Sequence, residues 1–425
     1  MKAPRGMHDI LPDEAPRWRA LESAIHALAA RYGYREIRTP VAEHTDVFVK
    51  TVGATSDLVT HEMYTFTDRG GRSLTLRPEG TAAVMRAYLE HGMASQPQPV
   101  RLYYVAPMFR YDRPQRGRYR MHYQFGAEII GTPHPAADVE VLSMPVRLMQ
   151  SLGLTEVLVR LNSIGDQVCR PQYVDALRAY FRPYAASLST DSQRRLETNP
   201  LRILESKAPQ DQDLVTNAPR MRDYLCEACR AHFDEVKRLF ATLDIPYVED
   251  PLIVRGLDYY TRTAAEIFSG RLGGAQNAML GGGRYDGLAE QLGGPPTPGV
   301  GFGQGLERLL LVLSAEGLDL GEAPREGTGA PVFVASVGPD AGRIAFRLLD
   351  QIRAAGIPAV GEMADRSLRA QMKSADRIGA RYAVIIGDQE VAAQEAGVRD
   401  LAAGTQESVG FGALPGYLRR AGGAG

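Results

Sequence analysis

The chain has 425 residues, of which 44% are hydrophobic and 23% charged, a composition typical of a soluble globular protein with two or three domains. Its 49 lysines and arginines nearly balance 50 aspartates and glutamates, so the net charge of -1 neither indicates nor excludes a nucleic-acid partner. The three cysteines exclude a disulfide scaffold, and no apolar run reaches the ~18 residues of a membrane span. Since the first residues also lack a signal peptide's apolar segment, we expect a cytoplasmic protein without membrane contact.

The first hundred residues predict a helix followed by short strands. Apolar residues recur at helical spacing from Leu21 to Tyr32, and this helix should end at Gly33. The sequence YREIRTP then predicts a short strand that ends at Pro40. Residues 73–76 predict another strand, which runs through RPEG into a helix.

Two further strands, 101–111 and 118–130, should be joined by the polar loop DRPQRGR. Because side chains alternate along a strand, the second strand has one apolar face and one polar face. The polar face changes from basic to acidic along its length and consists of Arg118, Arg120, His122, Gln124, Gly126 and Glu128. Such a face fits a ligand with a phosphate at one end and an ammonium or imidazole group at the other. The alternative is an ordinary half-exposed strand whose polar side faces water.

From about 170 to 240 the pattern becomes helical and charged, which indicates an insertion between two blocks of strands. Cys226 and Cys229 form a C-x-x-C pair there, with His232 three residues on and Cys169 far upstream. Zinc is conceivable, but the segment has helical periodicity and offers no second ligand pair. We therefore interpret these cysteines as part of a packed helix.

The glycine-rich stretches 280–288 and 298–313 contain neither a dinucleotide-binding nor a P-loop motif. Taken alone, Arg308 beside Glu307 favours a structural ion pair. Arg255 lies in an apolar segment and therefore needs an anion, either a neighbouring carboxylate or a ligand.

The last hundred residues predict a separate domain. Residues 317–329 have the composition of a linker. After them, PVFVASVG, a helix at 340–355, IPAVGE, a helix at 366–379 and YAVIIGD alternate strand and helix, the pattern of a small α/β domain. We thus expect one domain over 1–316 and a second over 330–425.

Five segments together resemble a known family over essentially the whole chain. REIRTPVAEHTDVF, MFRYDRPQRGRYRMHYQFGAE and GVGFGQGLERL are similar to motifs 1, 2 and 3 of class II aminoacyl-tRNA synthetases. VRGLDYYTRT and GGGRYDGL are similar to the signatures of the histidyl-tRNA synthetase family. The resemblance implies an α+β catalytic domain with an antiparallel six-stranded sheet, a helical insertion near the tRNA acceptor stem, and an α/β anticodon-binding domain. It also implies a homodimer, with Pro40 at the dimer contact.

The resemblance further implies roles for individual residues. Arg110 and Arg255 would be the catalytic cations at the α-phosphate of ATP, which carries Mg²⁺ on its phosphates, and no side chain is assigned as a metal ligand. In the motif 2 loop, Arg113 and Gln115 would meet the extra 5′ guanosine of tRNA(His). The histidine-binding residues would be Glu79, Thr81, Gln124, Glu128, Tyr259 and Tyr260, and the ATP-binding residues Arg110, Arg118, His122, Arg255 and Arg308.

His122 departs from the family pattern, which usually has a phenylalanine that stacks on adenine. A flat ring is kept, but its charge could vary with pH. Alternatively, Arg308 makes the main adenine contact and His122 is peripheral.

The expected activity is that of a histidine–tRNA ligase, which activates L-histidine with ATP and transfers it to tRNA(His). The alternative is the regulatory subunit of ATP phosphoribosyltransferase, a non-catalytic paralogue. That family lacks the anticodon domain and loses the histidine signatures, whereas this chain keeps both, including residues 366–388.

Overall fold

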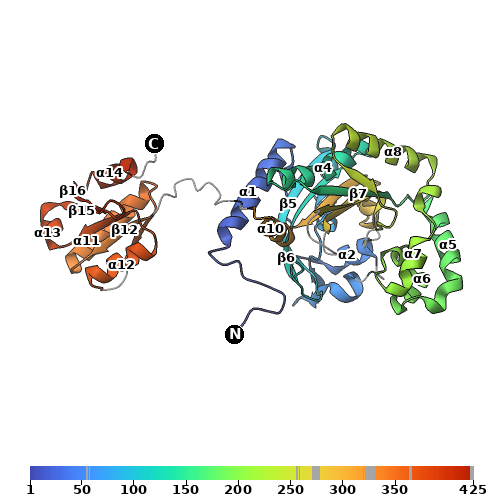
Figure 1. The fold of residues 1–425 in the computed structure, drawn as a ribbon, viewed down its shortest axis with the longest axis horizontal. Coiled ribbons are helices and arrows are strands. Elements are labelled where there is room, and N and C mark those ends of the chain that lie inside the picture. The colour runs from blue at the N-terminus through green and yellow to red at the C-terminus, as the bar shows by residue number, and fades with distance from the viewer. Residues whose placement is uncertain are drawn as a thin grey trace. The chain divides into compact units, whose positions relative to one another are not determined.

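The computed structural model describes residues 1–53, 56, 58–254, 257, 259–269, 278–318, 320, 331–362 and 366–421. Two structural units divide the chain, Met1–Ala323 and Pro324–Gly425 (Figure 1). Of the expected linker 317–329, residue 319 and residues 321–329 lie outside the described residues. Among the described residues, no helix combines the length and apolar character that crossing a bilayer requires.

The larger unit is built on an eight-stranded sheet with the order β1-β5-β6-β11-β10-β9-β7-β8. Its six inner strands are antiparallel, which confirms the expected sheet, and the short edge strands β1 and β8 add one parallel pairing each. In spatial order the strands are β1 (Arg35–Glu36), β5 (Val100–Phe109), β6 (Met121–Ile130), β11 (Gly299–Gly305), β10 (Ala278–Arg284), β9 (Thr261–Ser269), β7 (Val157–Ser163) and β8 (Tyr247–Glu249).

Strand β6 shows how the sequence pattern places its side chains. Phe125, Ala127 and Ile129 are fully buried in a core shared with helices α1 (Ala15–Arg31), α4 (Pro135–Ser151) and α10 (Leu306–Ala315). The residues between them face the other side of the sheet, where the candidate site lies. The predicted alternation of β6 is therefore confirmed from residue 121 onward.

The opposite face of the sheet is covered by α2 (Thr45–Val52) and α3 (Thr81–Glu90), which belong to a second core. Beside them, β2 (Ala42–His44), β4 (Ser73–Leu76) and β3 (Tyr64–Thr67) form a small antiparallel sheet. The predicted strand at 73–76 and the helix after RPEG are thus confirmed. Short helical segments lie at Leu58–Glu62, Met93–Ser95 and α9 (Leu288–Gln291).

The segment after β7 is a set of helices, drawn in green in Figure 1. It starts with α5 (Arg170–Phe181) and ends with α8 (Glu227–Thr242), which packs on α4. Between them lie 3-10 turns at Arg182–Ser187, Pro200–Glu205 and Met221–Asp223, and the helices α6 (Thr190–Thr198) and α7 (Pro209–Thr216).

The smaller unit has a five-stranded sheet with the order β13-β12-β14-β15-β16. The first three strands are parallel, as the alternating pattern predicts, whereas β15 and β16 form an antiparallel hairpin that the sequence reading did not include. The strands are β12 (Val332–Ser336), β13 (Ala359–Gly361), β14 (Tyr382–Ile386), β15 (Glu395–Asp400) and β16 (Gln406–Gly410). The helices are α11 (Pro339–Ala354), α12 (Leu368–Arg377), α13 (Asp388–Ala393) and α14 (Leu414–Ala421).

Candidate active site

A cavity of about 380 Å³ opens beside strands β6, β10 and β11. Residues from motif 2, motif 3 and the glycine-rich strand meet there although they are far apart in the sequence. Those that matter for charge and polarity are Arg110, Asp112, Arg118, His122, Gln124, Glu266, Glu307 and Arg308.

Three guanidinium groups line this cavity. The Nε of Arg110 donates to the carbonyl oxygen of Pro78 at 2.8 Å, Arg308 donates to the carbonyl of Ala278, and Arg118 pairs with Asp112. Burial and the nearby charge of Arg118 lower the pKa of Arg308. Guanidinium groups held close together in a partly desolvated cavity favour a phosphate-bearing ligand.

His122 lies among these cations. Burial, followed by the charges of Arg110, Arg118 and Arg308, lowers the pKa of His122 to about 3. The expectation that its charge varies with pH is therefore wrong for the neutral range, since the imidazole stays neutral there. A neutral flat ring at the cavity wall remains suited to stacking.

The ion pair that the sequence suggested between Arg308 and Glu307 is not formed among the described residues, so that prediction is wrong. Glu307 instead accepts a hydrogen bond from the backbone N–H of Tyr123 at 2.8 Å, which ties α10 to β6. Burial raises the pKa of Glu307 to about 7. Arg308 is thus directed by a backbone carbonyl, and both side chains line the cavity.

Next to the cavity, two carboxylates are buried without a salt-bridge partner among the described residues. Glu128 is fully buried and accepts hydrogen bonds from the hydroxyls of Thr81 at 2.8 Å and Tyr285 at 2.5 Å. Burial is the main reason that its pKa rises to about 8.

The second carboxylate, Glu79, is tied to the first turn of α3. It accepts from the backbone N–H groups of Thr81 at 2.7 Å and Ala82 at 2.9 Å, and from the hydroxyl of Tyr259 at 3.5 Å. Burial raises the pKa of Glu79 as well. Two desolvated carboxylates whose charge is disfavoured form a site that a cationic ligand would stabilise.

Two glycines of motif 3 make room for this site. A Cβ at Gly301 would lie 1.6 Å from Oε2 of Glu128, and one at Gly303 would lie 2.1 Å from Nε2 of Gln124. Strand β11 pairs with β6 at these positions, so any larger side chain would push into the polar face of β6. The glycine-rich pattern therefore serves close approach and not phosphate binding by a loop.

The remaining predicted site residues lie beside Glu79, in the loop between β5 and β6, or outside the described residues. The rings of Tyr259 and Tyr260 lie 4.7 Å apart, beside Glu79. Arg113 and Gln115 are exposed in the loop between β5 and β6. Arg255 lies outside the described residues.

Arg120 was predicted on the ligand face but lies elsewhere. Its guanidinium stacks over the ring of Tyr111 at 3.6 Å and donates to the carbonyl of Asp112. The alternation fails there because residues 118–120 precede β6, which begins at Met121.

Sequence reasoning did not single out two buried tyrosines of the site. Tyr285 donates to Glu128, and its signal was its position within GGGRYDGL. Tyr104 lies on β5, where its ring occupies the space that side chains at Gly80 and Gly126 would need. In the sequence, Tyr104 is only an aromatic residue within a strand, and this does not distinguish a residue of a binding site from one of the hydrophobic core.

Comparison with known proteins agrees with this arrangement. Residues 6–309 match the family described as histidyl-tRNA synthetase, and residues 331–421 match the anticodon binding domain. The chain is 49% identical over 416 residues to the histidine–tRNA ligase of Pelotomaculum thermopropionicum, covering 98% of this chain and 97% of that protein. It is 49% identical over 417 residues to that of Moorella thermoacetica, covering 98% and 97%.

A solved structure gives the same result. Apo histidyl-tRNA synthetase from Staphylococcus aureus superimposes with a TM-score of 0.79 at 41% identity, covering 98% of this chain and 99% of that one. Sequence and fold thus agree over both structural units, and the chain belongs to the histidyl-tRNA synthetase family.

Proposed function

We propose that this protein is a histidine–tRNA ligase, which forms histidyl-adenylate from L-histidine and ATP and transfers the histidyl group to tRNA(His). The observation that carries the proposal is the pairing of two sites with opposite electrostatic character. Two buried carboxylates, Glu79 and Glu128, adjoin a cavity lined by Arg110, Arg118 and Arg308. An amino acid with a cationic end and a nucleotide with an anionic end require such a pair.

Histidine would occupy the acidic site. Its ammonium group would approach Glu79 and Thr81, and its imidazole N–H would donate to Glu128, beside Gln124, Tyr259 and Tyr260. A bound donor or cation favours the ionised form of a buried carboxylate. Since burial raises the pKa of both carboxylates, the positive charge and donors of histidine would offset the cost of burying them in the ionised form.

ATP would occupy the cavity lined by arginines, with His122 and Arg308 near adenine. Mg²⁺ would enter with the nucleotide, bound to its phosphates. The carboxylate of Glu266 lines the same cavity. Because Mg²⁺ prefers one or two carboxylates together with phosphate oxygens, Glu266 and the phosphates of ATP fit the ion.

In the activation step the carboxylate of histidine attacks the α-phosphorus and diphosphate leaves. Negative charge grows on the equatorial oxygens, and the guanidinium of Arg110, held by Pro78, would stabilise it with little reorganisation. Arg255 would be the second cation there. The attacking carboxylate is already ionised, so the step needs no nucleophile from the protein.

The remaining parts would recognise tRNA. Arg113 and Gln115 lie in an exposed loop beside the cavity and would meet the 5′ guanosine, while residues 331–421 would bind the anticodon. Pro40 would contact the second subunit of a homodimer, and the enzyme would act in the cytoplasm.

The regulatory paralogue is the weaker alternative. The match to the anticodon binding domain and the full-length identity to histidine–tRNA ligases both favour the ligase.

The direct test is exchange of labelled diphosphate into ATP by the purified protein. We expect exchange that depends on L-histidine, and charging of tRNA(His) transcripts with histidine. Absence of histidine-dependent exchange by folded protein would reject the proposal.

A further inference from the structure

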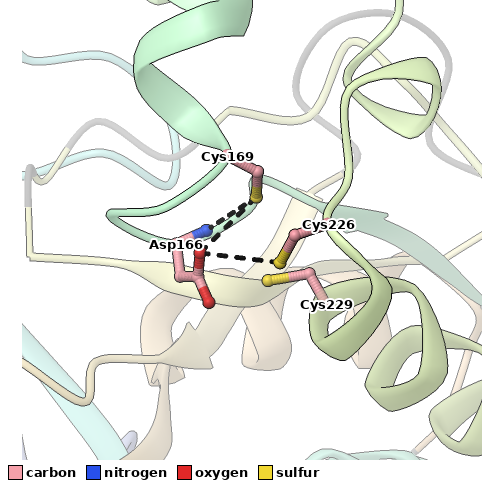
Figure 2. A group of neighbouring side chains, drawn as sticks. All are labelled: Asp166, Cys169, Cys226 and Cys229. Atoms are coloured by element: carbon pink, nitrogen blue, oxygen red, sulfur yellow. Dashed lines mark hydrogen bonds between the residues drawn. The ribbon is translucent and has the colours of Figure 1, made fainter.

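Four potential metal ligands converge outside the candidate active site. Figure 2 shows the side chains of Asp166, Cys169, Cys226 and Cys229 pointing toward one another. One ligand atom from each of them lies within 4.8 Å of all the others. No disulfide joins them, because all three cysteines are free.

The structure corrects the sequence-based objection to a metal here. Asp166 and Cys169, in the connection between β7 and α5, supply the second ligand pair that Cys226 and Cys229 lacked in the sequence. Each pair has two residues between its ligands, the spacing of zinc knuckles. His232, the other candidate, points elsewhere and bonds Asp138 at 3.2 Å.

The interatomic distances fit a tetrahedral ion after a small contraction. Sγ of Cys169 lies 3.5 Å and Sγ of Cys226 lies 3.9 Å from Oδ1 of Asp166. With metal–sulfur bonds of about 2.3 Å and metal–oxygen bonds of about 2.0 Å, a sulfur and an oxygen ligand of a tetrahedral ion lie about 3.5 Å apart. The present separations are therefore close to those that a bound ion would impose.

We propose that Asp166, Cys169, Cys226 and Cys229 bind one structural Zn²⁺ ion. The three soft thiolates select zinc over magnesium or calcium, which prefer oxygen ligands throughout, and zinc also accepts the one carboxylate. The four ligands leave no open position, so the site is structural and takes no part in the chemistry of the reaction.

Two of the thiols lie where a thiolate is stabilised. Cys169 is the N-cap residue of α5 and Cys226 that of α8, and a helix N-terminus stabilises thiolate. Nη2 of Arg262 lies 3.5 Å from Oδ2 of Asp166 and offsets part of the negative charge that zinc leaves uncompensated. These contacts supply the outer support that metal sites require.

The position of the site gives its role. Asp166 and Cys169 stand where the chain enters the helical insertion, and Cys226 and Cys229 stand where it returns to the catalytic domain through α8. One ion would therefore link the start of the helical insertion to its end. Next to Cys169, Arg170 donates to the carbonyl of Tyr260, so this link would also support the tyrosine segment of the proposed histidine site.

The first experiment measures metal in the full-length protein, purified without an affinity tag that binds metals and under reducing conditions. We expect one zinc per chain by elemental analysis, loss of zinc in Cys229→Ser, and retention in Asp166→Cys, which completes a four-cysteine site. Asp223→Asn is the matched control, because this exposed carboxylate is three residues before Cys226 and outside the cluster. It should keep its zinc.

A second measurement does not depend on the folding of a variant. Removing metal from the wild-type protein with a strong chelator should lower its melting temperature, and added Zn²⁺ should restore it. Substituted Co²⁺ should give intense thiolate-to-cobalt absorption bands. Wild-type protein that contains no zinc and takes up none when reduced, or that binds Co²⁺ without those bands, would overturn the proposal.

Discussion

The hydroxyl of Thr81 donates to Oε1 of Glu128 at 2.8 Å, which joins the first residue of α3 to strand β6. The same threonine gives its backbone N–H to Glu79 at 2.7 Å. One residue therefore holds both buried carboxylates, and it positions them before any ligand arrives. A preorganised acidic pair is what recognition of an amino acid with two donor groups requires.

The role of Glu128 can be tested by removing its charge alone. Glu128→Gln should raise the KM for histidine in diphosphate exchange by ~10- to 100-fold, since a hydrogen bond to a charged group contributes ~1.5–3 kcal/mol. The KM for ATP should change little. Tyr285→Phe, which removes one donor to Glu128 but keeps the carboxylate, should have a smaller effect. Exchange kinetics equal to wild type in Glu128→Gln would contradict the assignment.

Glu128 should also make the stability of the ligand-free protein depend on pH. Its pKa is raised to about 8 in the folded state, so the folded protein keeps a proton that the unfolded chain has released. The contribution of Glu128 to stability should therefore be lost as the pH rises from about 5 to about 8. Melting curves over this range should show a flatter dependence for Glu128→Gln than for wild type. Glu197→Gln, at an exposed position, should keep the wild-type slope.

Gly301 should be as important as the carboxylate that it accommodates. A Cβ in Gly301→Ala would lie 1.6 Å from Oε2 of Glu128, so the carboxylate must move. We expect a raised KM for histidine and a loss of stability of ~1–3 kcal/mol, as for other overpacked sites. Gly287→Ala is the control, because its Cβ would meet only Nε2 of Gln167, at 4.0 Å. Similar kinetics for both alanine variants would show that the close approach is unimportant.

Local pattern predicted the strand that carries much of the site. Period-two alternation placed His122, Gln124 and Glu128 on one face of β6, and the fold confirms it. Arg120 was misplaced because alternation holds only within a strand, and β6 starts one residue later. The hairpin of β15 and β16 was missed because β16 is mostly exposed and has no apolar run that would indicate a strand.

Contacts between distant segments could not be read from the sequence. Cys169 and Cys226 meet only because the intervening helices return the chain to its point of departure. The sequence shows glycines at 301 and 303, but only the pairing of β11 with β6 shows which side chains approach them. The spacing of residues in the sequence therefore predicts helices and strands. Which side chains meet across a sheet follows only from the register in which the strands pair.

We expect the larger structural unit to form histidyl-adenylate without the smaller one, and the smaller unit to be needed for efficient charging of tRNA(His). A chain that ends at Ala323 keeps the eight-stranded sheet and all described residues of the proposed histidine and ATP sites. We expect it to form histidyl-adenylate but to charge tRNA(His) poorly, because the anticodon contacts would be lost. Active-site titration and aminoacylation assays on the same folded sample measure the two properties. Charging as efficient as that of the full chain would assign residues 330–425 another role.

Arg110 provides the test of the proposed chemistry. Its Nε donates to the carbonyl of Pro78, so the rest of the guanidinium is held at the cavity wall, where the α-phosphate would lie. Arg110→Ala should slow adenylate formation by at least ~10²- to 10³-fold, the loss seen when one donor to a developing oxyanion is removed. Arg110→Lys should restore little, because a flexible ammonium does not reproduce the planar fork. Arg120→Ala is the control, since its guanidinium lies over Tyr111 outside the cavity lining.

The alternative for Arg110 is a purely structural role, in which the bond to Pro78 positions the neighbouring Glu79. In that case Arg110→Ala would raise the KM for histidine and lower the melting temperature, and both half-reactions would decline together. In the catalytic case the folded variant would bind histidine normally, and transfer from preformed adenylate to tRNA would suffer less than activation. The reason is that transfer attacks the carbonyl carbon and releases AMP, so the α-phosphate gains no new bond. Rapid-quench measurement of each half-reaction, with a melting curve on the same sample, distinguishes the two cases.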